Sequence, residues 1–215
     1  MDIGIAGADF DVKEAHKTYP MGLPSPMEDA FLLYAECYSS NIACGLIHPE
    51  DDLSPLKALY VPHWVIWKPE WTKAITAFVE RGGTLILSAL TGTRDEMNCV
   101  PNTLALGGGL SDLAGVSVEE FGRLAGPGAS GLGAPAEKNF AGAYVRSTHV
   151  LAASGQRRYS FRLGNHQIEA GHMYEKLIIA EGTQAHSTWA DGWLARPRSQ
   201  AGRLEKDGSF MWGLI

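Results

Sequence analysis

Two histidine–glutamate pairs in the second half of the sequence have a spacing that can bind a metal ion. His166 with Glu169, and His172 with Glu175, both follow the pattern H-x-x-E. On a helix, side chains three residues apart lie on one face and can ligate a divalent cation together. The surrounding residues favour strands and loops, so we interpret both pairs as polar surface and predict no metal site. His186 stands alone and is interpreted in the same way.

A cysteine nucleophile would need a paired base and a tight turn at the end of a strand. The apolar run 84–88 is such a strand, but it continues into Ala89, Leu90 and Thr91 without a cysteine. Cys99 lies further along, in a predicted loop, and no partner histidine is evident for it. We therefore interpret Cys99 as a loop residue and predict no thiol-based catalysis.

A third group of residues follows the predicted strands at their carboxyl ends, the edge where open α/β sheets bind ligands. Since tryptophan faces suit sugar rings, one hypothesis is a small sugar-binding pocket formed by Asp9, His63, Trp64, Thr91 and Asp95. The alternative places the tryptophans that follow the third strand in the core or at a subunit interface, where this residue type is enriched. We favour the alternative.

The elements that position these residues begin with short apolar runs. We predict strands at 2–6, 43–47, 58–62 and 84–88. The last of these is apolar almost throughout, which is typical of a strand covered by helices on both faces. Strands and helices that alternate in short succession favour parallel pairing with right-handed crossovers.

Two helices are predicted between these strands. The first begins with a capping box, in which Ser25 is the cap, Pro26 follows it and Glu28 completes the box. Its apolar residues are spaced as one helical face: Met27, Phe31, Tyr34 and Tyr38. The second helix carries apolar residues at i, i+3, i+4, i+7 and i+8 from Trp71 onward, and Gly82 ends it.

The rest of the chain carries weaker signals. Residues 107–115 predict a short helix and 116–121 a strand, whereas 122–139 are rich in Gly, Ala and Pro and predict a long loop. Alternating segments at 159–163 and 176–179 predict antiparallel strands.

These elements together predict one domain over residues 1–215. It has a core at 1–121, a Gly-rich loop at 122–139 and C-terminal strands at 140–215. The predicted fold class is α/β, flavodoxin-like and doubly wound, with a mostly parallel sheet and helices on both faces.

Charge, apolar runs and cysteine count indicate which kinds of partner and which cellular location to expect. The chain has 18 Lys and Arg against 24 Asp and Glu, a formal net charge of −6, so it lacks the cationic excess that draws proteins to nucleic acid or anionic lipid. Neither a signal peptide nor an apolar run of the roughly 20 residues that a membrane helix needs is evident. Three cysteines are too few for a disulfide framework, so we expect a cytoplasmic location.

One stretch of motifs resembles a known family. The segments ALYVP (58–62), GGTLILS (82–88), TGTRDE (91–96) and LAGVSVEEF (113–121) resemble the middle domain of family 42 β-galactosidases. Residues 174–204 look like a weaker version of that family's later strands. These motifs specify a fold rather than an activity.

The resemblance implies an assembly role. It implies a homo-oligomer, expected to be a trimer, attached to a TIM barrel that carries the catalytic glutamates of the family. It implies no catalytic residue and no cofactor in this chain. We expect the subunit interface to use the tryptophans outside the core stripe of the second helix: Trp64, Trp67, Trp189 and Trp193.

The same architecture also resembles class I glutamine amidotransferases, which place a cysteine on the turn after a strand. The corresponding turn here, after residues 84–88, has none. The alternative to an assembly domain is therefore a stand-alone sugar- or small-molecule-binding module that has lost this cysteine.

Overall fold

The centre of the protein is a parallel β-sheet, seen in a computed structural model that describes residues 1–7, 9–18, 23–123, 159–163, 165–170, 173–189, 202–203 and 210–212. In this part of the chain the sheet has five strands in the order β12-β4-β3-β1-β2. They are β1 (Ile3–Ala6), β2 (Cys44–Ile47), β3 (Ala58–Val61), β4 (Thr84–Leu87) and β12 (Phe210–Trp212). All four neighbouring pairs are parallel. The four predicted strands are thus confirmed to within one residue, and β12 is an addition that the sequence analysis did not foresee.

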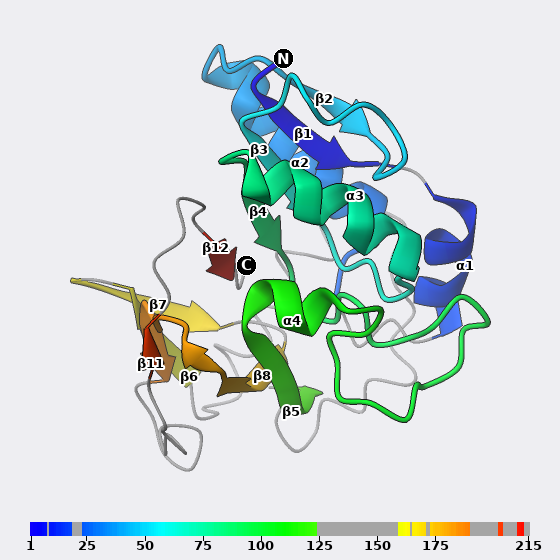
Figure 1. Ribbon diagram of the computed structural model, residues 1–215. Helices are drawn as coiled ribbons and strands as arrows, with labels where there is room; N and C mark the ends of the chain where they lie inside the picture. The colour runs from blue at the N-terminus through cyan, green and yellow to red at the C-terminus, as the bar shows by residue number, and fades with distance from the viewer. Residues whose placement is uncertain are drawn as a thin grey trace.

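The strand order is that of a flavodoxin-like sheet, with β12 in the fifth place. The chain moves outward from β1 to β2 and then returns to β3, so the direction of winding reverses between β1 and β3. Helices cover both faces, which confirms the predicted fold class (Figure 1). On one face, α2 (Pro26–Ser39) packs against β1 and β2, and α1 (Phe10–Thr18) contacts α2. On the other face, α3 (Pro69–Glu80) packs against β4 and α4 (Leu110–Ala114).

The capping box, the apolar helical face and the glycine stop predicted from the sequence are all present in the structure. Ser25 and Glu28 form the capping box of α2: the Glu28 N–H donates to Ser25 Oγ at 3.2 Å, and the Ser25 N–H donates to Glu28 Oε2 at 2.7 Å. Helix α3 buries Trp71, Ile75 and Phe78 against the sheet. Gly82 follows it with a φ of 93°, a conformation that costs glycine little.

The apolar row on α2 points away from the sheet. The helix buries Pro26, Asp29, Ala30 and Cys37 instead. The row itself is exposed, and we call it the aromatic face of α2: Met27, Phe31, Tyr34 and Tyr38. Small side chains let the helix approach β1 and β2 closely, while the larger ones lie toward solvent.

The second half of the chain adds antiparallel strands. β5 (Val116–Arg123) pairs with β8 (Met173–Ile179), and β6 (Tyr159–Leu163) pairs with both β7 (His166–Ala170) and β10 (Ser187–Trp189). A short parallel pair joins β9 (Glu181–Gly182) to β11 (Gly202–Arg203). These pairings confirm the predicted antiparallel strands. The predicted loop 122–139 lies, apart from its first two residues, outside the described residues.

Tryptophans on and before α3 pack together in the core. Trp64 and Trp67 follow β3, and both pack edge-on against Trp71, with ring centres 5.2 and 5.5 Å away. All three side chains are almost fully buried. The loop after β4 covers them, since the Gly92 N–H donates to the Trp64 carbonyl and the Trp67 N–H donates to the Arg94 carbonyl. None of the described helices is long and apolar enough to span a bilayer.

Candidate functional site

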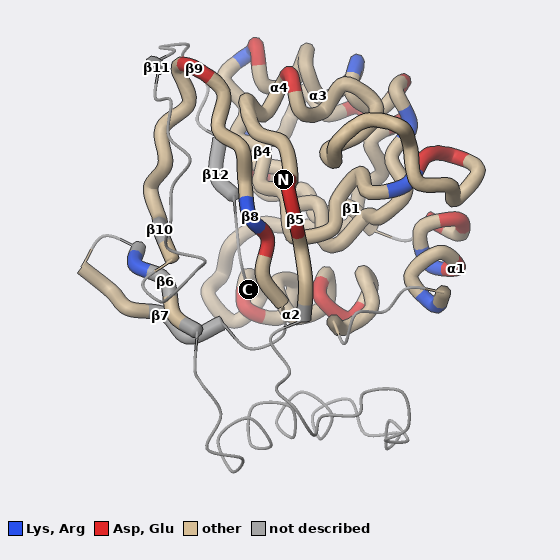
Figure 2. Tube along the Cα trace, turned by 90° about the horizontal axis from the view of Figure 1, so that it is seen from below, with Lys and Arg blue, Asp and Glu red and all other residues tan. Residues whose placement is uncertain are grey.

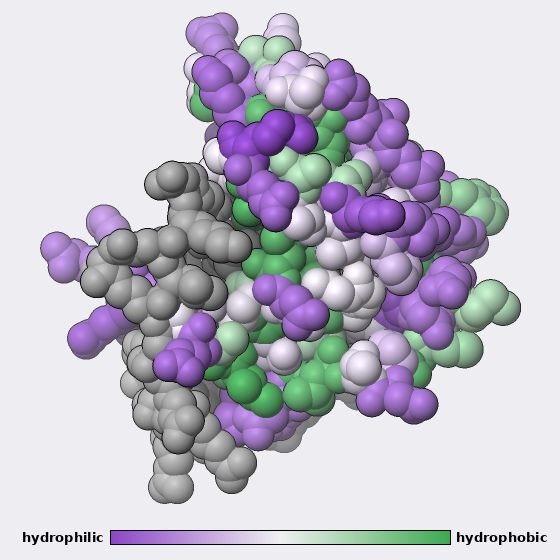
Figure 3. Space-filling view, viewed as in Figure 1, coloured by the Kyte–Doolittle hydropathy of each residue, from purple (hydrophilic) through white to green (hydrophobic). Residues whose placement is uncertain are grey.

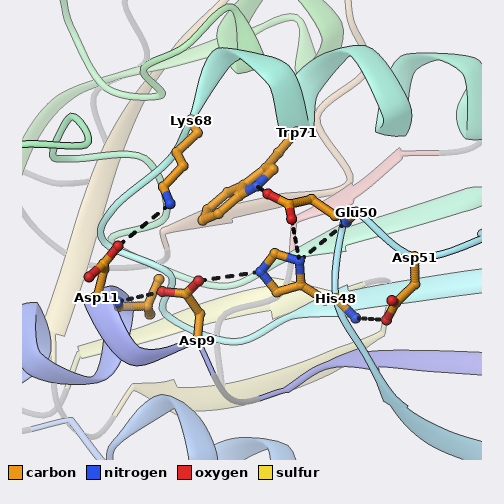
Figure 4. A network of polar contacts seen from close by, with 8 residues as sticks. Asp9, Asp11, His48, Glu50, Asp51, Lys68 and Trp71 are labelled. Atoms are coloured by element: carbon orange, nitrogen blue, oxygen red, sulfur yellow. Dashed lines mark hydrogen bonds and ion pairs between the residues drawn. The ribbon is translucent and has the colours of Figure 1, made fainter.

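A polar network lies at the carboxyl ends of β1 and β2 (Figure 4). His48 directly follows β2, and its Nε2 is 3.3 Å from Oδ2 of Asp9, which follows β1. On its other side, His48 Nδ1 is 3.9 Å from Glu50 Oε2, and Glu50 Oε1 accepts a 2.9 Å hydrogen bond from the Trp71 indole. The second Asp9 oxygen accepts from the Val12 N–H and so caps α1. The network therefore ties the first two strands to α1 and α3.

This network is partly open to solvent. The His48 side chain is 26% exposed and that of Asp9 is 13% exposed. Its polar atoms are mutually occupied, and the ring of His48 lies against Trp64 and Trp71. Such a rim can offer hydrogen bonds to a hydroxylated molecule but holds no free nucleophile. His48 was not singled out from the sequence, although its position directly after a predicted strand was a usable signal.

A second polar chain is buried between β3, β4 and α2. Ser88 Oγ is 2.8 Å from His63 Nδ1, and His63 Nε2 is 3.2 Å from Asp29 Oδ2, which also accepts a 2.6 Å hydrogen bond from the Tyr60 hydroxyl. Burial lowers the pKa of His63, although the nearby Asp29 carboxylate opposes the shift. A neutral imidazole pairs with both side chains if Nε2–H donates to Asp29 and Nδ1 accepts from Ser88, while the Ala89 carbonyl also lies 3.3 Å from Nδ1.

Ser88, His63 and Asp29 are the residue types of a serine hydrolase triad. Their burial and the occupied backbone donor beside them do not allow that chemistry. Ser88 is 1% exposed and His63 is 3% exposed, so no substrate carbonyl can reach the hydroxyl. The next backbone donor on the turn, the Leu90 N–H, is occupied by Glu175 Oε1 at 2.7 Å and cannot stabilise an oxyanion. The buried chain instead joins the ends of two strands to the first turn of α2.

Glu175 is the most perturbed acid in the described chain. It lies on β8, is 2% exposed, and its Oε2 has no hydrogen-bond partner among the residues that the structure describes. Burial raises its pKa to about 7, even though the bond from Leu90 opposes the shift. Leu90 has a φ of 63°, so this side chain braces a strained turn at the carboxyl end of β4. In the sequence, Glu175 stands out only as part of an H-x-x-E pair.

The five residues predicted to form a ligand pocket do not share one cavity. His63 and Thr91 meet at Ser88, where the Thr91 hydroxyl donates to the Ser88 carbonyl at 2.7 Å, and both are buried. Trp64 is buried beside them. Asp9 lies in the network around His48, whereas Asp95 caps its own loop by accepting from two backbone N–H groups. Of the five, only Asp9 and Asp95 are partly accessible.

The predicted interface tryptophans need correction. Trp64 is 0% exposed and Trp67 is 1% exposed, so neither can contact another subunit. Both lie under the loop after β4, which the sequence did not show to be a cover. Trp189 is half-buried and its indole donates to the Glu175 carbonyl at 3.3 Å, so its place at an interface stays a prediction. Trp193 lies outside the described residues.

The other candidate residues from the sequence do not form a catalytic or metal site within the described residues. His166 and Glu169 belong to strand β7 rather than to a helix, and His172 lies outside the described residues. Within the described ranges, no group of three or more His, Cys, Asp or Glu residues could hold a metal ion. Cys99 is exposed, and its thiol lies 3.7 Å from the Met97 carbonyl. His186 is exposed in the loop before β10.

Comparison with known proteins identifies the fold. Residues 27–130 match the family model described as the β-galactosidase trimerisation domain. This part of the chain is a β-galactosidase trimerisation domain. The match runs from α2 through the sheet strands β2, β3 and β4 to β5, so it includes the aromatic face of α2.

Curated relatives agree with this assignment. The chain is 36% identical over 96 residues to the β-galactosidase BgaB of Geobacillus sp. (strain Y412MC61), and 34% identical over 95 residues to the β-galactosidase BglY of Alicyclobacillus acidocaldarius. These alignments cover 45% and 42% of this chain but only 14% and 13% of the relatives. The trimerisation domain is thus similar to a small part of much longer proteins.

Solved structures support the fold over more of the chain. A β-galactosidase from Halorubrum lacusprofundi superposes with a TM-score of 0.70 at 16% identity, covering 98% of this chain and 27% of that protein. A β-galactosidase from Bacillus circulans sp. alkalophilus gives a TM-score of 0.66 at 17% identity, covering 90% and 25%. The antiparallel second half therefore belongs to the same architecture as the sheet.

Proposed function

We propose that this chain is a non-catalytic assembly domain that forms contacts between subunits of a β-galactosidase. The single observation that carries the proposal is the match of residues 27–130 to the β-galactosidase trimerisation domain. The site geometry agrees with it, since the buried row Ser88–His63–Asp29 is closed to substrate and Glu175 occupies the Leu90 N–H on the adjacent turn. Galactoside hydrolysis is assigned to an associated barrel domain, and the working location to the cytoplasm.

Exposed apolar side chains support an assembly role, but they are not the tryptophans that the sequence predicted at the interface. Two of the four tryptophans expected at the interface are buried, but the aromatic face of α2 is open. Tyr38 is 76% exposed and Phe31 is 58% exposed, and both lie inside the segment matched by the family model. Contiguous exposed apolar surface of this kind marks interaction sites more often than free surface.

The mass of the isolated chain in solution tests the proposal. One copy weighs 23.2 kDa, so three copies give about 70 kDa. Sedimentation velocity across a concentration series is expected to show the larger species. A 23.2-kDa monomer at every concentration would contradict self-assembly of this chain.

A catalytic assay tests the other half of the proposal. We expect the isolated chain neither to hydrolyse galactosides nor to release ammonia from glutamine. Turnover that disappears in Cys99→Ser would show that a thiol site exists after all.

A small-molecule-binding role is a second proposal, favoured by the partly exposed Asp9 and His48 at the carboxyl edge of the sheet. Titration calorimetry with galactose, with His48→Ala as the comparison, tests it. Heat of binding that is lost in the variant would support the role, and no heat with the unmodified chain would contradict it.

A further inference from the structure

Two cysteine side chains meet between helix α2 and the sheet. Cys37 lies in the last turn of α2, and Cys44 is the first residue of β2. The Cys44 thiol lies next to the Cys37 thiol and interacts with it directly. Both are free thiols, and neither belongs to the two polar networks described above. The fold thus brings two oxidisable groups together at a place that the proposed assembly role does not explain.

The chain between the two cysteines folds back on itself. The Ile42 N–H donates to the Cys37 carbonyl at 2.8 Å, so the residues after α2 turn directly toward β2. The N–H groups of Asp2 and Ile3 donate to the Ala43 carbonyl, at 2.9 and 3.1 Å, and tie the start of β2 to β1. Backbone hydrogen bonds on both sides of the pair therefore hold the two thiols near each other.

The two thiols differ in accessibility. Cys37 is 4% exposed, whereas Cys44 is half-buried on β2, the last strand in the order of the described sheet. The Cys44 thiol lies 4.0 Å from the Tyr34 carbonyl, a weak contact that costs little to break. Burial raises the pKa of the Cys37 thiol, and the adjacent Cys44 thiol raises it further. A dissolved reagent is therefore expected to react first at Cys44.

The pair lies on the α2 side of the sheet. The two perpendicular views place α2 opposite α3 and α4, with strands of the parallel sheet between them (Figures 1 and 2). The face that carries α3 and α4 is mainly hydrophilic over α3, with apolar side chains gathered around α4 (Figure 3). A covalent link between Cys37 and Cys44 would leave that face unchanged and would fix only the end of α2 to the edge of the sheet.

We propose that Cys37 and Cys44 form a reversible thiol switch, a site that a low-molecular-weight disulfide such as oxidised glutathione converts to an intramolecular disulfide. In a reducing compartment disulfides are usually transient, and many of them report the redox state. A half-buried cysteine beside a second, buried one is the arrangement in which the first reacts and the second resolves the adduct.

Two thiol–disulfide exchanges complete the conversion. The Cys44 thiolate attacks one sulfur of oxidised glutathione, which forms a mixed disulfide at Cys44 and releases one glutathione thiolate. The Cys37 sulfur then attacks the Cys44 sulfur and displaces the second glutathione thiolate. Each glutathione thiolate takes up a proton that one of the cysteines has lost. Overall, two cysteine thiols are oxidised and one glutathione disulfide is reduced to two thiols, and excess reduced glutathione drives the same steps backward.

Mass spectrometry of the folded, full-length chain tests the switch. The chain is incubated at neutral pH with mixtures of reduced and oxidised glutathione, and free thiols are alkylated after an acid quench. No Lys or Arg lies between Lys17 and Lys57, so trypsin leaves Cys37 and Cys44 in one peptide. We expect this peptide to lose two hydrogen atoms and to carry neither alkyl group nor glutathione. Cys99, which is exposed and lies in a different peptide, should carry glutathione and serves as the internal control.

Single variants separate the two roles. Cys37→Ala leaves the attacking thiol without its partner, so glutathione should stay on Cys44. Cys44→Ala leaves only the buried thiol of the pair, and Cys37 should then react at least about tenfold more slowly than Cys99 of the same chain. Circular dichroism first establishes that each variant is folded. The glutathione titration of the unmodified chain tests the switch without any substitution.

Three outcomes overturn the inference. A glutathione adduct that persists on Cys44 of the unmodified chain would show that Cys37 does not reach it. Alkylation of both cysteines at every glutathione ratio would show that the pair stays reduced. A disulfide that excess reduced glutathione does not reopen would show a fixed bond rather than a switch. None of these results bears on self-assembly, which sedimentation measures separately.

Discussion

The replacement Glu175→Gln isolates the cost of burying one carboxyl group. Glutamine keeps the shape and an oxygen that can accept from the Leu90 N–H, but it does not titrate. In the folded protein the pKa of Glu175 is raised from 4.5 to about 7. The folded state therefore retains a proton that the unfolded state has already released.

The sign of the pH dependence follows from this difference. Below pH 4.5 both states are protonated and the group imposes no cost. Between pH 4.5 and about 7 stability falls as pH rises, and above 7 a buried carboxylate carries the full penalty. The shift of the pKa corresponds to about 3 kcal/mol of unfolding free energy. The variant should therefore gain about 3 kcal/mol relative to the unmodified chain between pH 4 and pH 8.

Urea unfolding at several pH values and one fixed protein concentration measures this gain. Glu181→Gln is the matched control, because Glu181 is exposed on the neighbouring strand β9 and its replacement should change stability by less than about 0.5 kcal/mol at each pH. Stability curves of Glu175→Gln and the unmodified chain that stay parallel from pH 4 to pH 8 would refute the reasoning.

Three further substitutions probe the fold. Ser25→Ala removes the cap of α2 and should lower the unfolding free energy by about 1 kcal/mol, whereas Ser39→Ala at the exposed end of the same helix should change it little. Gly83→Ala would place a Cβ in steric overlap with the Phe78 ring, and chemical denaturation should show a loss of about 1–3 kcal/mol. Asp29→Ala removes the carboxylate that accepts from the Tyr60 hydroxyl and lies beside His63 Nε2, and it should cost about 3 kcal/mol, measured in the same way. A loss under about 1 kcal/mol would show that this buried polar row is not structural.

The parallel sheet could be predicted because its signals are local. The apolar run 84–88, the capping box at Ser25 and the stripe that begins at Trp71 each act within one element, and the structure confirms all three. Local patterns do not show which way a helical face points. The row from Met27 to Tyr38 was recognised as one face, but its exposure follows from the small Ala30 and Cys37 on the other side.

The buried polar groups could not be predicted, since they depend on contacts between distant residues. Asp29 meets His63 from 34 positions away, and Glu175 meets Leu90 from 85 positions away. The tryptophans were misassigned for the same reason. The loop that covers Trp64 and Trp67 follows them by about 25 residues, and nothing in its composition shows where it packs.

The position of β12 beside β4 has a consequence for synthesis of the protein on the ribosome. Strand β4 ends at Leu87, and the backbone groups on its outer edge pair with Phe210–Trp212. At typical translation rates the intervening stretch takes on the order of ten seconds to make. Throughout that interval an apolar, fully formed strand has an open edge, which is the feature that recruits neighbouring nascent chains into aggregates. Yield at high expression levels should therefore depend on chaperones that bind extended apolar segments during translation.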